Sequence, residues 1–303
     1  MEKIVITTTS FGEYDNSCLE KCRSQGLEII LNPYRRKVDQ DELIGLAGEA
    51  VGLIAGTESI TKDVLLRLCK LRVISRCGSG MDNVDIEAAK SLKIKLYNTP
   101  DAPTPAVAEL TLGLMICLLR KINEMDLSLK RGKWEKRMGN MLKDKKVGII
   151  GFGRIGKKVA ELLKPLGCET AYSDPFVKEG LSGLKNKPKE SLLPWADIIT
   201  LHASTDELIL GGEEIRLMKK GAWLVNVSRG GAIDEASLYQ ALQEGRISGA
   251  ALDVFGEEPY TGPLRELNNV ILTPHIGSYA KEARIKMETE AVENLLKGLR
   301  EEN

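Results

Sequence analysis

The sequence has only two histidines, few aromatic residues and no excess of either charge. Its 303 residues include 43 Lys and Arg against 43 Asp and Glu, so the formal net charge is zero. Such a chain lacks the broad positive field that non-specific binding to nucleic acid or to an anionic membrane requires. We therefore expect no nucleic-acid partner, and we expect any anionic ligand to be held by local groups.

The sequence also has no long apolar run and no clustered cysteines. Its most apolar stretch, residues 106–119, contains Glu109 and is too short for a membrane span, which needs about 20 residues. The N-terminus, MEKIVITTT, lacks the basic start and apolar centre of a signal peptide. The six cysteines show no Cys-x-x-Cys spacing. We interpret them as reduced thiols of a soluble cytoplasmic protein without a membrane partner.

Short apolar runs alternate with helical segments along most of the chain. In the first half the runs are residues 4–8, 28–31, 51–55, 73–77 and 95–97. In the second half they are residues 146–151, 169–173, 197–202, 223–227, 249–254 and 270–273. The stretches between them have apolar residues three or four apart, which is typical of helices. This alternation predicts an α/β protein with two doubly wound parallel sheets.

The boundary between the two sheets is predicted near residues 99–105, where three prolines interrupt both patterns. A long helical stretch, residues 105–131, follows the boundary. The final segment, residues 279–303, has an apolar stripe but no strand after it, so we expect it to pack back onto the first domain. The predicted domains are therefore residues 1–99 with 279–303, and residues 100–278.

The most informative string is KKVGIIGFGRIGKKVAELLKPLG, residues 145–167. A β-branched run leads into three glycines, and a predicted helix follows them. Gly151 permits a tight turn, Gly153 lets the backbone approach a pyrophosphate, and Gly156 lets the helix pack closely on the strand. The phosphates would then lie on the free amides at the positive end of the helix. This pattern indicates a dinucleotide-binding domain.

Asp174 supports that interpretation, because it ends the next apolar run, where an acidic side chain bonds the ribose hydroxyls of a dinucleotide. A carboxylate there would repel a 2′-phosphate, so the predicted cofactor is NAD and not NADP. The alternative is a cluster of turn glycines followed by a solvent-exposed aspartate.

The two histidines make the search for an acid/base group short. His202 and His275 each follow an apolar run in the second half, and position alone does not separate them. Ligands of open α/β sheets bind outside the carboxyl ends of the strands, so both histidines are predicted to lie near the cofactor. Because the two stand in separate segments, they supply no cluster of metal ligands, and we expect no metal.

Two further residues favour His275. Glu258, in DVFGEEP, could bond one imidazole nitrogen, fix the tautomer and leave the other nitrogen for a substrate. Arg229, in LVNVSRGGAID, could clamp a carboxylate bidentately. A cation, a proton carrier and an orienting carboxylate are the groups needed for hydride transfer to a 2-keto acid. From spacing alone, Arg229 could still be a surface charge and Glu258 a turn residue.

At this point the motifs resemble those of a known family, the NAD-dependent D-isomer-specific 2-hydroxyacid dehydrogenases. The matching strings are GSGMDNVD (78–85), NTPDAPTPAVAELTLGLM (98–115), GFGRIG (151–156), VNVSRGGAID (225–234), AALDVFGEEP (250–259) and TPHIGS (273–278). With RGKWEKR at 131–137, the chain is most similar to the phosphoglycerate dehydrogenase branch. The resemblance implies a Rossmann NAD-binding domain and a smaller, flavodoxin-like substrate-binding domain built from both chain ends.

The resemblance also implies roles for individual residues. His275 would be the acid/base, Glu258 its partner, and Arg229 the residue that binds the substrate and polarises its carbonyl. The backbone of Ser79 and Gly80 would receive the substrate carboxylate. The residues expected at the cofactor, from the glycine fingerprint, strand position and the resemblance together, are Gly151, Gly153, Arg154, Ile155, Gly156, Asp174, His202, Asp253 and Thr104. Of these, Asp253 would contact the nicotinamide amide.

The implied activity is the NAD-dependent oxidation of 3-phospho-D-glycerate to 3-phosphooxypyruvate, in serine biosynthesis. Alternatives are a glyoxylate or hydroxypyruvate reductase, another D-2-hydroxyacid dehydrogenase, or an NAD-sensing binding protein like the corepressors of the family. Family members are commonly homodimers through the helical segment after the boundary, with which the apolar run 106–119 agrees; the alternative is that this run is an internal core helix.

The sequence departs from the family pattern in three places. Residues 203–206, Ala-Ser-Thr-Asp, lack the usual proline after His202. Residues 56–61, GTESIT, lack an arginine that some phosphoglycerate dehydrogenases carry there. Since the chain ends at Asn303, we expect no C-terminal regulatory domain.

Overall fold

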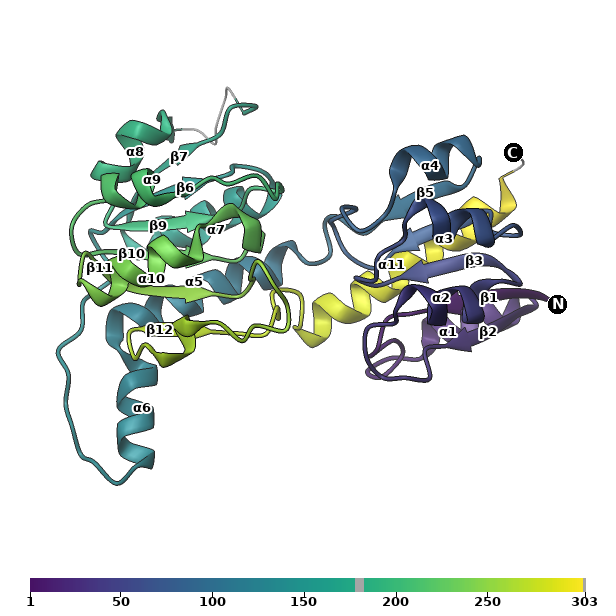
Figure 1. Ribbon diagram of the computed structural model, residues 1–303, viewed down its shortest axis with the longest axis horizontal. Helices are drawn as coiled ribbons and strands as arrows, with labels where there is room; N and C mark the ends of the chain where they lie inside the picture. The colour runs from purple at the N-terminus through teal and green to yellow at the C-terminus, as the bar shows by residue number, and fades with distance from the viewer. Residues whose placement is uncertain (178–182, 302–303) are drawn as a thin grey trace. The chain divides into compact units, whose positions relative to one another are not determined.

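The computed structural model describes residues 1–177 and 183–301. The chain divides into two compact units, one formed by Met1–Pro103 with the segment from Ser278 onward, the other by Thr104–Gly277. Each unit contains one parallel β-sheet with helices on both faces (Figure 1). The predicted α/β class with two parallel sheets is therefore confirmed.

The first unit has its strands in the order β2-β1-β3-β4-β5, which is the flavodoxin-like order. The strands are β1 (Glu2–Ile6), β2 (Leu27–Leu31), β3 (Ala50–Ala55), β4 (Val73–Arg76) and β5 (Lys95–Asn98). The helices are α1 (Ser17–Ser24), α2 (Gln40–Ala47), α3 (Lys62–Arg67), α4 (Ile86–Ser91) and α11 (Lys281–Arg300).

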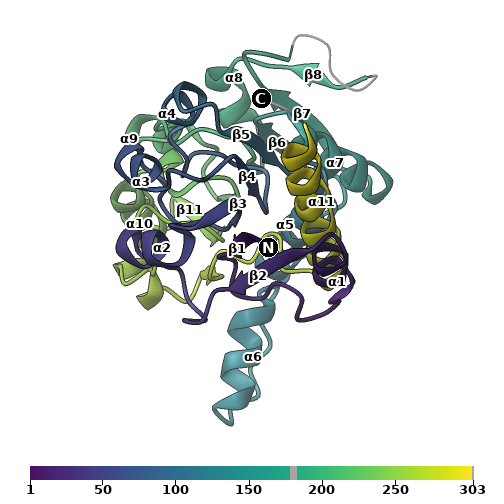
Figure 2. The same ribbon diagram turned by 90° about the vertical axis from the view of Figure 1, so that its right-hand side faces the viewer.

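The helices of this unit cover both faces of its sheet. Figure 2 shows α2, α3 and α4 on one face, with α1 and α11 on the other. The final helix, α11, packs against β3, β4 and β5. It buries Met287, Ala291 and Leu295 there, because these residues fall on one side of the helix.

The second unit has its strands in the order β12-β11-β10-β9-β6-β7-β8, and the direction of winding reverses between β6 and β9. This is the Rossmann arrangement, with one strand added at the β12 edge. The strands are β6 (Lys146–Ile150), β7 (Glu169–Ser173), β8 (Lys185–Asn186), β9 (Ile198–Leu201), β10 (Ala222–Asn226), β11 (Ile247–Leu252) and β12 (Val270–Leu272). Strand β8, which is two exposed residues long, matches none of the predicted apolar runs.

Two helical layers enclose the second sheet. Apolar residues of α5 (Thr104–Arg120) and α7 (Arg154–Leu163) pack on one face. Those of α8 (Lys189–Trp195), α9 (Gly212–Leu217) and α10 (Glu235–Gln243) pack on the other. Three short 3₁₀ turns complete the described elements, at Lys164–Leu166, Gly230–Ala232 and Pro263–Glu266.

The long helical stretch predicted over residues 105–131 consists of two helices, α5 and α6 (Ile122–Lys130). Lys121 has φ +53°, a left-handed conformation that ends the hydrogen-bond ladder of α5. Periodicity could not reveal this break, because apolar residues continue across it. Within the second unit, α6 projects away from the sheet (Figure 1), and only Ser128 of this helix is buried.

Residues 1–177 and 183–301 include no helix with the length and apolar character needed to cross a membrane.

Candidate functional site

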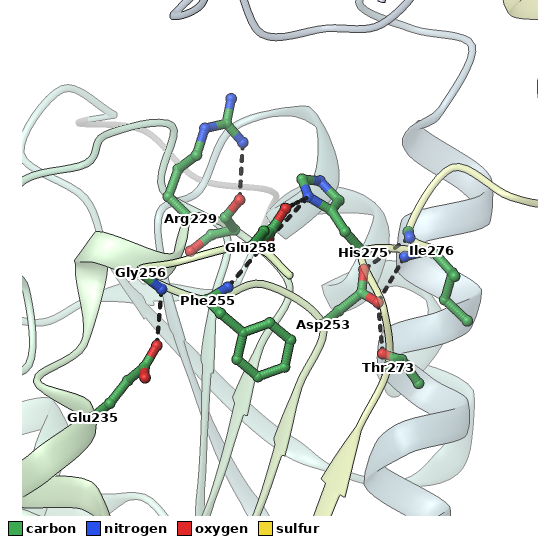
Figure 3. Close-up of polar contacts among 11 residues, drawn as sticks. Arg229, Glu235, Asp253, Phe255, Gly256, Glu258, Thr273, His275 and Ile276 are labelled. Atoms are coloured by element: carbon green, nitrogen blue, oxygen red, sulfur yellow. Dashed lines mark hydrogen bonds and ion pairs between the residues drawn. The ribbon is translucent and has the colours of Figure 1, made fainter. Parts of the chain in front are cut away.

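Three loops of the second unit follow neighbouring parallel strands. Arg229 comes after β10, residues 253–258 come after β11, and residues 273–277 come after β12. Strands β10 and β11 pair in parallel, as do β11 and β12, so the three loops leave the same edge of the sheet. Figure 3 shows their polar side chains gathered at this edge. This is where open α/β sheets bind ligands.

His275 and Glu258 form the central contact. His275 Nδ1 lies 3.0 Å from Glu258 Oε2 and 3.2 Å from Oε1. The side chains are 48% and 40% exposed, so this contact contributes little to folding stability. A carboxylate on Nδ1 favours the tautomer that carries its proton there and leaves Nε2 as the acceptor. His275 also has φ +54°, an uncommon conformation for a residue with a side chain, and such conformations cluster at functional sites.

Asp253 holds the loop that carries His275. Its buried carboxylate accepts hydrogen bonds from Thr273 Oγ1 at 2.6 Å and from the amides of Ile276 and Gly277, each at 2.8 Å. Burial raises the pKa of the Asp253 carboxyl, although these hydrogen bonds oppose the shift. Asp253 therefore fixes the path of residues 273–277 on both sides of the histidine.

Arg229 is held by a turn directly after β10. Asn226 Nδ2 donates to the Arg229 carbonyl at 2.9 Å, while Asn226 Oδ1 accepts from the amide and hydroxyl of Ser228. The guanidinium Nη1 donates to the Ser228 carbonyl at 2.9 Å. The buried Asn226 was not identified from the sequence, although it stands in the string that carries Arg229.

The glycine turn joins β6 to α7, and its three glycines have different surroundings. Gly151 has φ +87°, and a Cβ there would lie 2.4 Å from the Ala203 backbone nitrogen. A Cβ on Gly156 would lie 2.3 Å from the Gly151 carbonyl oxygen. At Gly153 an added Cβ would meet no atom within 4 Å. Gly151 and Gly156 thus serve packing, whereas Gly153 faces open space.

That open space fits the pyrophosphate of a dinucleotide. Gly153 is the N-cap of α7, and the first turn of the helix, which begins with Arg154 and Ile155, holds no acidic residue. The first amides of a helix have no partner within the helix and carry its positive end, so they attract phosphate.

Asp174 follows β7, and its carboxylate accepts a hydrogen bond from the glycine turn. Its Oδ2 accepts from the Phe152 amide at 2.7 Å, and its Oδ1 accepts from the amides of Phe176 and Val177 at 2.8 Å and 3.1 Å. The carboxylate thus also positions the turn itself, a contact that spacing alone did not predict.

His202 differs sharply from His275. It is buried, and its Nε2 lies 2.9 Å from Thr200 Oγ1. Within the part of the chain that the structure describes, Nδ1 has no hydrogen-bond partner. Burial lowers the pKa of His202 to about 3, so its ring is neutral at physiological pH. Burial therefore distinguishes His202 from His275, which position in the sequence alone could not do.

The remaining predicted residues are placed as follows. Thr104 is the first residue of α5. Ser79 and Gly80 follow β4 in the first unit, where the Ser79 carbonyl accepts from Asn98 Nδ2 at 2.7 Å. Among residues 1–177 and 183–301, no group of three or more His, Cys, Asp and Glu side chains could hold a metal ion.

The fold and the glycine turn of the second unit define a dinucleotide-binding protein of the Rossmann class. The sequence model of the D-isomer specific 2-hydroxyacid dehydrogenase NAD-binding domain matches residues 112–277. The chain belongs to the D-isomer-specific 2-hydroxyacid dehydrogenase family, as its motifs indicated. The matched model describes an NAD-binding domain, so the cofactor is NAD.

Individual relatives and a solved structure agree with this assignment. A D-3-phosphoglycerate dehydrogenase of Methanocaldococcus jannaschii is 43% identical over 275 residues, covering 87% of this chain and 52% of the relative. A hydroxypyruvate reductase of Thermotoga maritima is 38% identical over 290 residues, covering 91% of this chain and 95% of the relative. The TT0316 protein of Thermus thermophilus superposes with a TM-score of 0.92 at 34% identity, covering 98% of this chain and 96% of that chain. The chain spans about half the length of several phosphoglycerate dehydrogenases that it matches.

Proposed function

We propose that this chain transfers hydride between NAD and the C2 carbon of a small D-2-hydroxy or 2-keto acid. The observation that carries the proposal is the contact of His275 with Glu258, at the sheet edge where the Arg229 loop also lies. The glycine turn of the same unit supplies a place for the cofactor. NAD, when bound, supplies the hydride acceptor or donor.

In the oxidative direction, His275 Nε2 accepts the proton of the C2 hydroxyl as the hydride leaves C2. Glu258 holds Nδ1–H and stabilises the imidazolium that forms. The Arg229 guanidinium binds the substrate carboxylate and polarises the developing carbonyl. In reduction the same groups act in reverse, with His275 donating the proton. The backbone of Ser79 and Gly80 is proposed to receive the substrate carboxylate as well.

The local geometry of the glycine turn and of Asp174 supports the cofactor contacts that we propose. The N-terminus of α7 would hold the pyrophosphate, and Asp174 would accept hydrogen bonds from the adenosine ribose, which favours NAD over NADP. The proposed cofactor residues are Gly151, Gly153, Arg154, Ile155, Gly156, Asp174, His202, Asp253 and Thr104.

The first substrate we propose is 3-phospho-D-glycerate, oxidised to 3-phosphooxypyruvate in serine biosynthesis. The identity with proteins named as D-3-phosphoglycerate dehydrogenases supports this choice. The second candidate is reduction of hydroxypyruvate or glyoxylate, because the relative named as a hydroxypyruvate reductase is matched over nearly its whole length.

One structural observation favours the second candidate. In the segment 56–61, which lacks an arginine, the Glu58 side chain is 2% exposed. Its carboxylate accepts from Thr7 Oγ1 and from the Gly56 amide at 3.1 Å. A buried carboxylate at this place disfavours a phosphate nearby.

We also propose that the chain forms a homodimer through α6 and the segment that follows it. Large apolar side chains are exposed there, among them Leu129 at 54%, Trp134 at 79% and Met138 at 91%. Exposed apolar surface of this kind marks an interface. Light scattering on the purified protein should give twice the chain mass.

For a cytoplasmic protein, reduced thiols are expected, and burial raises the pKa of Cys18 and Cys77 to about 11.

The test is the absorbance of NADH with purified protein and a panel of substrates. The panel contains 3-phosphoglycerate with NAD or NADP, and hydroxypyruvate, glyoxylate and pyruvate with NADH. The highest kcat/KM for 3-phosphoglycerate with NAD would support the serine-pathway substrate. Turnover of an unphosphorylated keto acid alone would replace it with the second candidate. An inactive protein that binds NADH tightly would contradict the enzyme proposal and favour a binding protein.

A further inference from the structure

Glu235 is the first residue of α10, and its carboxylate forms a hydrogen bond with a loop outside this helix. The N-terminus of α10 is already capped by Asp234, whose side chain accepts from the amides of Ala236 and Ser237. The partly buried Glu235 instead turns toward the loop after β11, where Oε1 accepts from the Gly256 amide at 2.8 Å. Figure 3 shows this contact beside the Glu258–His275 pair.

Gly256 stands two residues before Glu258, in the loop that sets the position of the Glu258 carboxylate. On one side of Gly256, the Phe255 amide donates to Glu258 Oε1 at 3.2 Å, so Glu258 is held by its own loop as well as by His275. The Phe255 ring is buried and stacks on Tyr260, with the ring centroids 4.4 Å apart. The backbone direction at residues 255–256 therefore determines where Glu258 meets the imidazole.

The segment that carries Glu235 also carries Arg229. This segment contacts the Glu258 loop at a second position, Gly230. A Cβ added to Gly230 would lie 1.9 Å from the carbonyl carbon of Phe255 and 2.4 Å from the Gly256 nitrogen. The two backbones therefore touch at Gly230, and the Glu235 hydrogen bond joins them again a few residues later. Residues 229–235 and 255–258 are therefore held against each other at two points, and these two segments carry Arg229 and Glu258.

We propose that Glu235 is a positioning residue for hydride transfer, which acts through Gly256 and Glu258 to hold His275 in its productive orientation. This inference rests on the proposed function. Glu235 touches neither substrate nor cofactor in this role. The Glu235 carboxylate fixes the loop that carries Glu258, and the Glu258 carboxylate in turn orients the His275 imidazole.

The test compares three substitutions that separate the hydrogen bond from the charge. Glu235→Gln keeps the acceptor oxygen and removes the charge, so kcat should stay near that of the natural protein. Glu235→Asp keeps an acid at the start of α10, so the helix should fold normally, but the shorter side chain no longer reaches the Gly256 amide. For Glu235→Asp and Glu235→Ala we expect kcat to fall about 10- to 100-fold, the usual effect of a small misplacement of a catalytic group. KM for NAD should stay unchanged.

Matched controls distinguish positioning from a general loss of structure. Glu190→Ala removes a first-turn glutamate from α8 of the same unit and should leave kcat unchanged. In a Glu258→Ala background, Glu235→Asp should have no further effect, because the two residues act in one chain of contacts. The inference is overturned if Glu235→Asp retains full kcat, or if Glu235→Gln lowers kcat as much as Glu235→Ala does. It is also overturned if Glu235→Asp lowers kcat by the same factor in the Glu258→Ala background as in the natural protein.

A second readout does not depend on activity. With only two histidines in the chain, an imidazole ¹H–¹⁵N spectrum contains two ring systems, and the buried His202 provides an internal reference. Glu235→Asp should change the tautomer pattern of His275 and leave that of His202 as it was. An unchanged His275 pattern refutes positioning by Glu235 even if no substrate is found. A changed pattern in a protein that turns over no acid would refute the proposed function but not this contact.

Discussion

Replacing Gly153 by alanine should weaken cofactor binding without weakening the fold. An added Cβ at this position would meet no protein atom within 4 Å, and the φ of −74° is one that alanine adopts. Alanine lowers the entropy of the unfolded chain, a gain of roughly 0.4–1 kcal/mol, and the loss of glycine at the N-cap offsets it. The net change in folding free energy should therefore stay within about 1 kcal/mol. For a domain of this size that is a change in Tm of roughly 2–4 °C at most.

The effect on the cofactor should be larger. The methyl group would occupy the space in front of the first amides of α7, where we place the pyrophosphate. Loss of one hydrogen bond to a charged group costs about 1.5–3 kcal/mol, which corresponds to an affinity for NADH roughly 10- to 150-fold weaker. Calorimetric titration with NADH measures this change, and thermal unfolding of the protein without cofactor measures the stability.

Gly156→Ala is the matched control, because its Cβ would lie 2.3 Å from the Gly151 carbonyl oxygen and the backbone must move. Overpacking of this kind costs about 1–3 kcal/mol, so Tm should fall. If Gly153→Ala binds NADH as tightly as the natural protein, the pyrophosphate does not lie at this turn. If Gly153→Ala unfolds as readily as Gly156→Ala, the distinction between an open glycine and a packed one is wrong.

Three further predictions concern His275, Gly230 and His202. His275→Ala should lower kcat by about two to four orders of magnitude, the range for general acid–base catalysis, and a loss below roughly tenfold in steady-state assays would remove it from that role. Gly230→Ala places a Cβ 1.9 Å from the Phe255 carbonyl carbon, so kcat should fall about 10- to 100-fold as the two loops separate, and unaltered kinetics would contradict the contact. For His202, whose folded-state pKa of about 3 lies below the ordinary 6.5, protonation favours the unfolded chain. The stability that neutral His202 contributes is thus present above pH 6.5 and is lost as the pH falls toward 3. Between pH 7 and pH 5, the free energy of unfolding in denaturant should therefore fall by about 2 kcal/mol more for the natural protein than for His202→Asn. Equal acid sensitivity of the two proteins would show that His202 is not buried.

Most of the fold could be predicted because strands in parallel sheets are continuous apolar runs. Such runs stand out against the three-to-four spacing of the helices that cover them. The predicted run 169–173 coincides with β7, and most others differ from the observed strands by one or two residues. Strand β8 could not be found in this way, because its two exposed residues have no apolar pattern. The break at Lys121 was missed for a different reason, since a left-handed lysine leaves no trace in periodicity.

The sequence also contained the residues of the candidate site, but not the contacts that hold them. Strings such as DVFGEEP and TPHIGS led to Glu258 and His275, and the structure places their side chains 3.0 Å apart. The contact of Glu235 with Gly256 joins positions on different strand connections, and no local pattern predicts it. Asp174 shows the same limit, because its hydrogen bond to the Phe152 amide depends on the pairing of β6 with β7.

The two histidines show why burial had to come from the structure. Both follow strands of one parallel sheet, so their sequence contexts are alike, yet His202 lies in a buried environment beside Thr200, whereas His275 lies in an exposed loop. Burial without a charged partner lowers the pKa of His202 to about 3, and a ring with that pKa is neutral throughout the physiological range. A proton carrier must instead reach its substrate and stabilise its own positive charge. Of the two histidines, His275, which is exposed and in contact with the Glu258 carboxylate, meets both conditions, and its environment therefore supports the proposed acid/base role independently of the family resemblance.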